Sequence, residues 1–230
     1  MVKCALLKTE GYSKNVTVNA VRNDTSPQQR IQYYYGEYNR TGIDAKPWTY
    51  QYSAGPPSEA IDHAWDQLDY TLDVATASVA PDGSVNENSS FLPILDLIVP
   101  AADISLIFLS ANDIMFQEPS KDDWYAAERP TTQKFSFFED ENRSFYVRNE
   151  PVRVLGCASR YQFCNPNIER NSSCTTWGGI EQTMALAGNL WQTERQKVLV
   201  GLSMDRILGL NAQSLGMAVV PFRTINGKMR

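Results

Sequence analysis

Four cysteines place the strongest constraint on how this 230-residue chain can fold. Cys157, Cys164 and Cys174 lie within 18 residues of one another, whereas Cys4 stands alone near the N-terminus. Four cysteines allow three disulfide pairings, and the sequence does not choose among them. We favour a short loop from Cys164 to Cys174 beside a long link from Cys4 to Cys157. Disulfides of this kind indicate an oxidising compartment.

A zinc site is the alternative use of these cysteines. Structural zinc sites usually pair cysteines with roughly two to four residues between them. Here six and nine residues separate the successive cysteines of the cluster, and the chain has one histidine, His63. The sequence therefore favours disulfides and predicts neither a metal nor a cofactor.

Acceptor triplets for N-glycosylation give a second, independent indication of compartment. The pattern Asn-X-Ser/Thr matters only to a chain that enters the secretory pathway. About two such triplets would arise by chance in a chain of this composition, and some occurrences are explained by the preference of Asn for turns. The excess predicts an extracellular or cell-surface glycoprotein. The six acceptors are Asn15, Asn23, Asn39, Asn88, Asn142 and Asn171.

The charge of the chain narrows the range of partners. Its net charge of -5 gives no attraction for the phosphates of nucleic acids or of anionic membranes. The basic residues are scattered, and the tightest grouping, Arg143, Arg148 and Arg153, has a spacing typical of a solvated strand face. We therefore exclude nucleic acid as a partner.

A membrane anchor is not visible in these residues. The most apolar stretch, 91–116, is interrupted by Pro93, Asp96 and Pro100, so it cannot form the roughly 20-residue apolar helix that spans a bilayer. The first 30 residues contain no apolar signal segment. We expect any membrane attachment to come from segments missing from this chain.

The first half of the chain has the periodicity of strands. Apolar and polar residues alternate with period two in 15–19 and in 48–53, which is typical of strands with one face on a core. The segment 103–109 is nearly continuous in apolar residues and is the candidate for the most buried strand. Closely spaced strands with turn signals between them predict about eight strands in an antiparallel sandwich.

Helical patterns occur at two places. Ser58 is a good N-cap, and the apolar residues that follow it recur at helical spacing, which predicts a short helix near 58–69. Beyond Cys174 the sequence becomes richer in helix-forming residues. We expect an α+β fold, a β-rich antiparallel sandwich followed by a C-terminal helical segment. Residues 1–176 form the β-rich ectodomain with the disulfide-stapled segment 157–174, and residues 177–230 form a helical appendage.

No catalytic constellation stands out. A Ser-His-Asp or Cys-His arrangement would have to use His63, which falls on the predicted helix. Hydrolysis of glycans requires two carboxylates at a defined separation. Acidic residues are plentiful and no spacing singles out a pair, so a secreted carboxylate-dependent hydrolase remains the alternative function. The candidates are Asp103, Asp113, Glu118, Asp122 and Asp123.

Aromatic residues offer one binding hypothesis. Period two places Trp48, Tyr50 and Tyr52 on one face of a strand, where their rings could stack on sugars. Packing into the core is the alternative use of the same face. Candidate partners are a cell-wall glycan or another surface protein.

Three segments of the chain form a recognisable set. They are Asp103 to Asn112, Asp122 to Tyr125 with Arg129-Pro130, and Leu155-Gly156-Cys157 with Tyr161-Gln162-Phe163-Cys164-Asn165-Pro166. Together they resemble a family of uncharacterised filamentous-fungal proteins. The resemblance covers residues 70 to 190. It implies a large ectodomain attached to transmembrane helices, with a cysteine-rich segment and then a helical region. It implies a cell-surface location and no particular activity, so we expect a non-catalytic role in recognition or structure.

Overall fold

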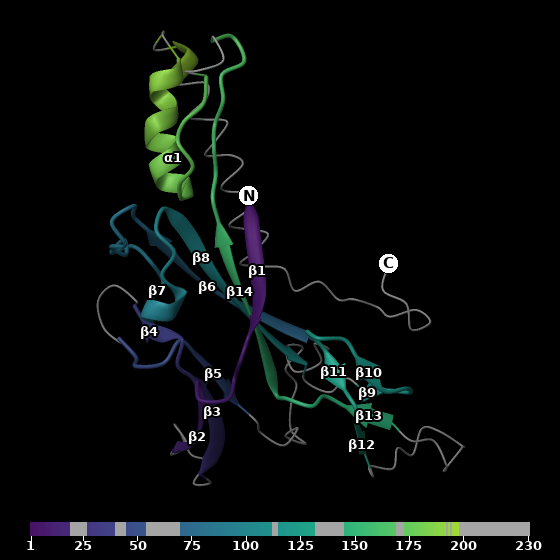
Figure 1. Ribbon diagram of the computed structural model, residues 1–230. Coiled ribbons are helices and arrows are strands. Elements are labelled where there is room, and N and C mark those ends of the chain that lie inside the picture. Colours follow the sequence, from purple (N-terminus) through teal and green to yellow (C-terminus); the bar gives the residue numbers. More distant parts are fainter. Residues whose placement is uncertain are drawn as a thin grey trace.

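The computed structural model in Figure 1 describes most of the first 197 residues. The described ranges are 1–18, 27–39, 45–53, 70–111, 115–131, 145–168, 173–191, 193 and 195–197. Strands dominate these ranges, and all the strand pairs are antiparallel. A short helix follows near the C-terminal end. The prediction of a β-rich α+β fold with a C-terminal helical segment is therefore confirmed.

The strands in chain order are β1 (Val2–Leu7), β2 (Ser13–Val18), β3 (Gln28–Tyr33), β4 (Gly36–Tyr38), β5 (Tyr50–Ser53), β6 (Tyr70–Val79), β7 (Phe91–Pro93), β8 (Ala102–Ala111), β9 (Met115–Phe116), β10 (Ser120–Lys121), β11 (Ala126–Ala127), β12 (Arg129–Thr131), β13 (Phe145–Val147) and β14 (Val152–Ser159). The helical elements are the 3-10 turn η1 (Leu95–Leu97), the α-helix α1 (Ile180–Ala187) and the 3-10 turn η2 (Gly188–Leu190).

The main sheet has the strand order β1-β14-β8-β6. Its two long strands, β6 and β8, pair over their whole length, from Tyr70 opposite Ala111 to Val79 opposite Ala102. Along β8 every second residue is buried, including Ile104, Leu106 and Phe108. The residues between them are half-buried. The strand expected to be the most buried is thus buried mainly on one face.

A second layer covers that buried face and completes a sandwich. It consists of the sheet β2-β3-β5 and the two-stranded sheet β4-β7. The core between the layers is rich in aromatic rings: Tyr50 stacks on Phe108 with 4.6 Å between ring centroids, and the rings of Tyr33 and Tyr35 each lie 6.2 Å from that of Phe108. Large rings that fill the space between two sheets supply most of the apolar area buried there.

One glycine permits the close approach of β4 to β7. Gly36 has φ +150, and a Cβ atom at this position would lie 2.1 Å from the carbonyl oxygen of Leu92. A side chain therefore cannot be accommodated without moving the backbone of β7.

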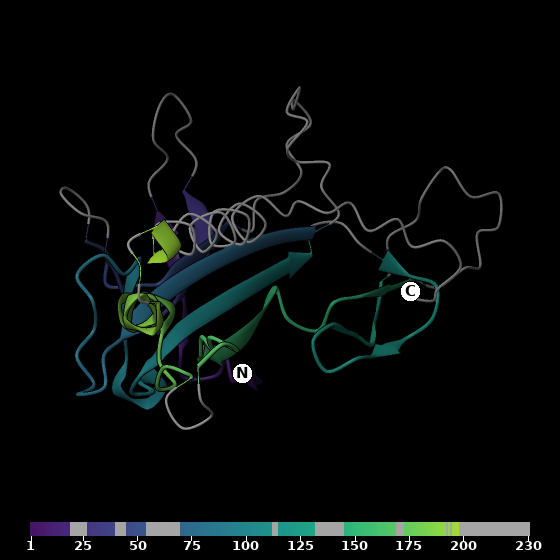
Figure 2. The same cartoon turned by 90° about the horizontal axis from the view of Figure 1, so that it is seen from above.

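Short strands form a separate unit beyond one end of β6 and β8, as Figure 2 shows from above. The sheet β12-β13-β9 and the hairpin β10-β11 make up this unit. Its small core contains Tyr125 and Ala127, with Leu109 and Phe116 packed against them. The ring of Phe116 lies 5.1 Å from that of Tyr125.

Helix α1 is anchored to the main sheet by a carboxylate. One oxygen of Asp103 on β8 accepts a hydrogen bond from the Ser78 hydroxyl at 2.9 Å, and the other accepts one from the backbone N–H of Ile180 at 2.8 Å. Ile180 is the first residue of α1, whose N-terminal N–H groups need acceptors from outside the helix. Asp103 thus caps α1 and fixes it to the sheet. Figure 1 shows α1 standing beyond one end of the main sheet.

Several expected elements agree with the structure and others lie outside it. The expected strands at 15–19, 48–53 and 103–109 correspond to β2, β5 and β8, with boundaries that differ by at most two residues. The short strands β9 to β12 were not expected, because each is too short to show an alternating pattern. The predicted helix near 58–69 and the region 198–230 lie outside the described residues.

Candidate functional site

The four cysteines form two disulfides, Cys4–Cys157 and Cys164–Cys174. No cysteine in the chain is left free. This is the pairing favoured from the sequence. The two bonds are neighbours along the chain, because β14, which carries Cys157, leads directly into the segment that carries Cys164 and Cys174.

Both disulfides join residues that face each other across antiparallel backbone. Cys4 on β1 lies opposite Cys157 on β14, with 4.1 Å between their Cα atoms. Cys164 lies opposite Cys174 in a narrow ribbon, with 4.0 Å between Cα atoms. In antiparallel pairs, the positions that do not exchange backbone hydrogen bonds bring Cα atoms closest together. The pairing of the strands therefore brings each pair of sulfurs within bonding distance.

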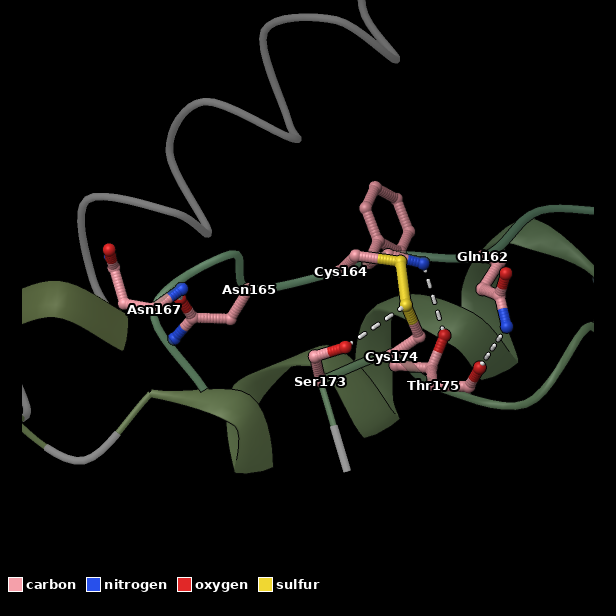
Figure 3. The surroundings of a disulfide bond; sticks show 8 residues. Gln162, Cys164, Asn165, Asn167, Ser173, Cys174 and Thr175 are labelled. Atoms are coloured by element: carbon pink, nitrogen blue, oxygen red, sulfur yellow. Dashed lines mark hydrogen bonds between the residues drawn. A yellow bond between two sulfur atoms is a disulfide. The ribbon is translucent and has the colours of Figure 1, made fainter. Parts of the chain in front are cut away.

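The ribbon around Cys164–Cys174 is held by a ladder of hydrogen bonds, part of which Figure 3 shows. The N–H of Asn165 donates to the carbonyl oxygen of Ser173 at 2.6 Å, and the N–H of Thr175 donates to that of Phe163 at 2.8 Å. The Thr175 hydroxyl in turn accepts from the Phe163 N–H at 3.1 Å. The side chain of the buried Asn165 donates to the carbonyl oxygen of Leu190 at 2.7 Å, which ties the ribbon to the helical segment.

Three of the six glycosylation acceptors lie on described residues. Asn15 on β2 and Asn88 in the loop before β7 are exposed. Asn39, directly after β4, is half-buried, and its side-chain amide donates to the carbonyl oxygen of Glu87 at 3.2 Å. The other acceptors, Asn23, Asn142 and Asn171, lie outside the described residues.

The structure separates the three aromatic residues proposed to stack on sugars. Tyr50 and Tyr52 share one face of β5, as period two requires, but that face packs into the core between the sheets. Trp48 precedes the strand and remains partly exposed. The ammonium group of Lys46 lies 5.0 Å from the centroid of the Trp48 ring, a cation–π contact. Of the three, Trp48 is the one that does not pack against the core between the sheets.

A polar cluster at the end of the core was missed by the sequence analysis. Arg148 donates to the Tyr52 hydroxyl, and its guanidinium lies over the Tyr52 ring, 5.3 Å from the centroid. Arg153 donates to a carboxylate oxygen of Glu150 at 3.1 Å, and the other oxygen of Glu150 accepts from the Thr9 hydroxyl at 3.0 Å. Arg148, just after β13, therefore contacts Tyr52 on β5. Arg153 on β14 contacts Glu150 in the loop before that strand, so both side chains have partners and do not form the solvated face expected from their spacing. Arg143 lies outside the described residues.

The carboxylates considered for hydrolysis have structural roles or face solvent. Asp103 caps α1, and one oxygen of Asp122 accepts from the N–H groups of Trp124 and Tyr125 at 2.9 and 2.8 Å, which closes a turn. Glu118 and Asp123 are exposed, and Asp113 lies outside the described residues, as does His63. No group of three or more metal-ligating side chains occurs in the described part of the chain.

Comparison with known proteins found no matching family model, no similar curated protein and no similar solved structure. The resemblance of the cysteine segment to a fungal family therefore stays a prediction. None of the helices in the described ranges combines the length and the apolar character needed to cross a membrane.

Proposed function

We propose that this chain is the extracellular or cell-surface ectodomain of a glycosylated fungal membrane protein, with a non-catalytic role in recognition or structure. The observation that supports the proposal most strongly is the use of every cysteine in a disulfide. Cys4, Cys164 and Cys174 are exposed. Disulfides that solvent can reach are reduced in the cytosol and persist in secreted proteins. Two such bonds are consistent with an extracellular or secreted domain.

The described acceptor asparagines support the same compartment. An oligosaccharide is bulky and needs an asparagine at the surface. The side chains of Asn15 and Asn88 meet this requirement. Neither side chain contributes to the core, so attached glycans would leave the sandwich intact.

Glycosylation provides the direct test of this proposal. When a eukaryotic host secretes the chain, we expect its mass to fall on treatment with an endoglycosidase. Asn88→Gln should reduce this fall in mass by the mass of one glycan, because position 88 is exposed. Asn167→Gln is the matched control, since Asn167 is also exposed but is not followed by Ser or Thr at the second position. An unmodified mass together with four free thiols would refute the extracellular assignment.

A recognition role can be tested at Trp48. We expect a cell-wall glycan, if it is the ligand, to stack on this ring, so Trp48→Ala should weaken binding about 10-fold on a glycan array. Trp177→Ala is the control, because Trp177 is 50% exposed and lies in the disulfide ribbon, outside the sandwich layers. Unchanged binding by Trp48→Ala would exclude stacking at this ring. Absence of binding to any glycan would favour a surface protein as the partner.

A further inference from the structure

Within the described ranges, no strand pairs with the outer edge of β1. Met1 and Arg160 exchange two backbone hydrogen bonds, each of 2.7–2.8 Å. Because such exchanges alternate along an antiparallel pair, the residues of β1 that bond to β14 are those at odd positions. The backbone N–H and C=O groups of Val2, Cys4 and Leu6 therefore point away from β14.

The opposite border of the main sheet is closed over part of its length. The outward backbone groups of Thr76 on β6 bond to Ser90, and those of Ser78 bond to Asn86 and to the Ser89 hydroxyl. Within the described residues, no comparable segment pairs with the outer edge of β1. In Figure 1, β1 accordingly forms the border of the sheet beside β14.

The composition of β1 gives this edge little protection against pairing. Proteins usually guard edge strands with several charges, a proline or a bulge. The sequence of β1 is Val-Lys-Cys-Ala-Leu-Leu, with one charged residue, Lys3, and no proline. Its first four residues are exposed, and Val2 is 61% exposed. Such an edge is suited to the addition of a strand.

We propose that β1 pairs antiparallel with β1 of a second copy of this chain, about a two-fold axis at Cys4. This register places Cys4 opposite its counterpart and Val2 opposite Leu6 of the second copy, so all the outward backbone groups find partners. Val2 and Leu6 lie on the same face of β1, so the register forms two apolar cross-strand pairs. Lys3 faces Ala5 of the second copy, and no like charges stand opposite each other. The two main sheets become one continuous sheet.

The intrachain disulfide makes this arrangement possible. Cys4 is bonded to Cys157 through its side chain, so the bond does not use the backbone groups of Cys4 at the edge. The bond also holds β1 on β14, so that β1 presents a fixed strand for pairing. The pairing does not depend on glycosylation or on the proposed location of the chain.

The test uses the full chain with both disulfides intact and glycans removed. We expect sedimentation to show a monomer–dimer equilibrium that shifts with concentration. Val2→Pro should weaken the dimer about 30-fold. The substitution removes the N–H of residue 2 in both copies, so two hydrogen bonds between the copies are lost at once. The monomer should stay folded, since the N–H of Val2 does not bond to β14 and edge strands tolerate proline there. In dilute solution, the melting temperature of the Val2→Pro variant should equal that of the wild-type protein.

A second pair of variants and a positional measurement complete the test. Val2→Lys should also weaken the dimer, whereas the matched control Leu95→Lys, at a residue 85% exposed on η1, should not. Amide exchange of Val2, Cys4 and Leu6 should slow as the dimer forms. A monomer at every concentration would overturn the proposal. So would a dimer that Val2→Pro leaves unchanged, or one in which these three amides exchange as fast as in dilute protein.

Discussion

Replacing Cys4 and Cys157 together by alanine is expected to lower the free energy of unfolding by roughly 5 kcal/mol. The bond joins residues 153 positions apart, and in the chain-entropy model a longer closed loop restricts the unfolded state more. A loss of this size is comparable with the whole stability of many domains. Urea denaturation of the oxidised wild-type protein and of the double variant measures the difference.

The second disulfide is the matched control for this effect. Cys164 and Cys174 lie 10 positions apart, so Cys164→Ala with Cys174→Ala should cost roughly 3 kcal/mol. The loss of structure should also be concentrated in the ribbon and α1, while the spectroscopic signal of the aromatic rings in the sandwich core stays unchanged. Equal losses for the two double variants would contradict the dependence on loop length.

Raising the pH above 10 is expected to destabilise the fold steeply. Burial raises the pKa of Tyr33, Tyr35 and Tyr50 well above the ordinary value of 10.0. Neighbouring groups add to the rise: the Glu150 carboxylate acts on Tyr33, the Tyr33 hydroxyl on Tyr35, and the Asp73 carboxylate on Tyr50. Tyr33 and Tyr35 are each 2% exposed, so their rings meet almost no solvent.

The sign of the effect follows from which state holds the protons. Below pH 10 these tyrosines are protonated in both states, and their contribution to stability is complete. Above pH 10 the unfolded chain releases protons that the folded chain retains, so the free energy of unfolding falls until the pH passes the raised pKa values. Three such groups give a slope approaching 4 kcal/mol per pH unit.

Denaturant titrations between pH 9 and pH 12, with tyrosinate absorbance recorded in parallel, measure this slope. Tyr33→Phe removes one of the ionising hydroxyls and should reduce the slope by about one third. If Tyr33, Tyr35 and Tyr50 ionise near pH 10 while the protein stays folded, the buried aromatic core would be refuted.

Local patterns in the sequence predicted the sandwich and the disulfides well. Strands such as β2 and β8 are long enough for their burial to appear as a period in the sequence. The sequence allowed three cysteine pairings, and the structure has the favoured one: a short Cys164–Cys174 loop and a long Cys4–Cys157 link. The short strands β9 to β12 have two or three residues each, and their pairing depends on distant partners that no local pattern records.

The contacts of individual side chains were harder to predict. Nothing in the sequence around Asp103 indicates that it caps a helix that begins at Ile180, because the contact spans 77 positions. The same is true of Arg148 and Tyr52, which are 96 positions apart. The alternation at Tyr50 and Tyr52 correctly placed both rings on one face, but periodicity cannot distinguish a face on a core from a face for a ligand.

The order of the cysteines along the chain has a consequence for biosynthesis. In a chain that is oxidised as it enters the secretory pathway, Cys4 enters before the other three of these cysteines, and the next of the four is its native partner Cys157. The last two thiols are again partners and follow each other closely. At about 5–20 residues per second, Cys157 follows Cys4 by roughly 8–30 seconds. Joining thiols in their order of emergence thus yields the native bonds directly, without the reshuffling that interleaved pairings require.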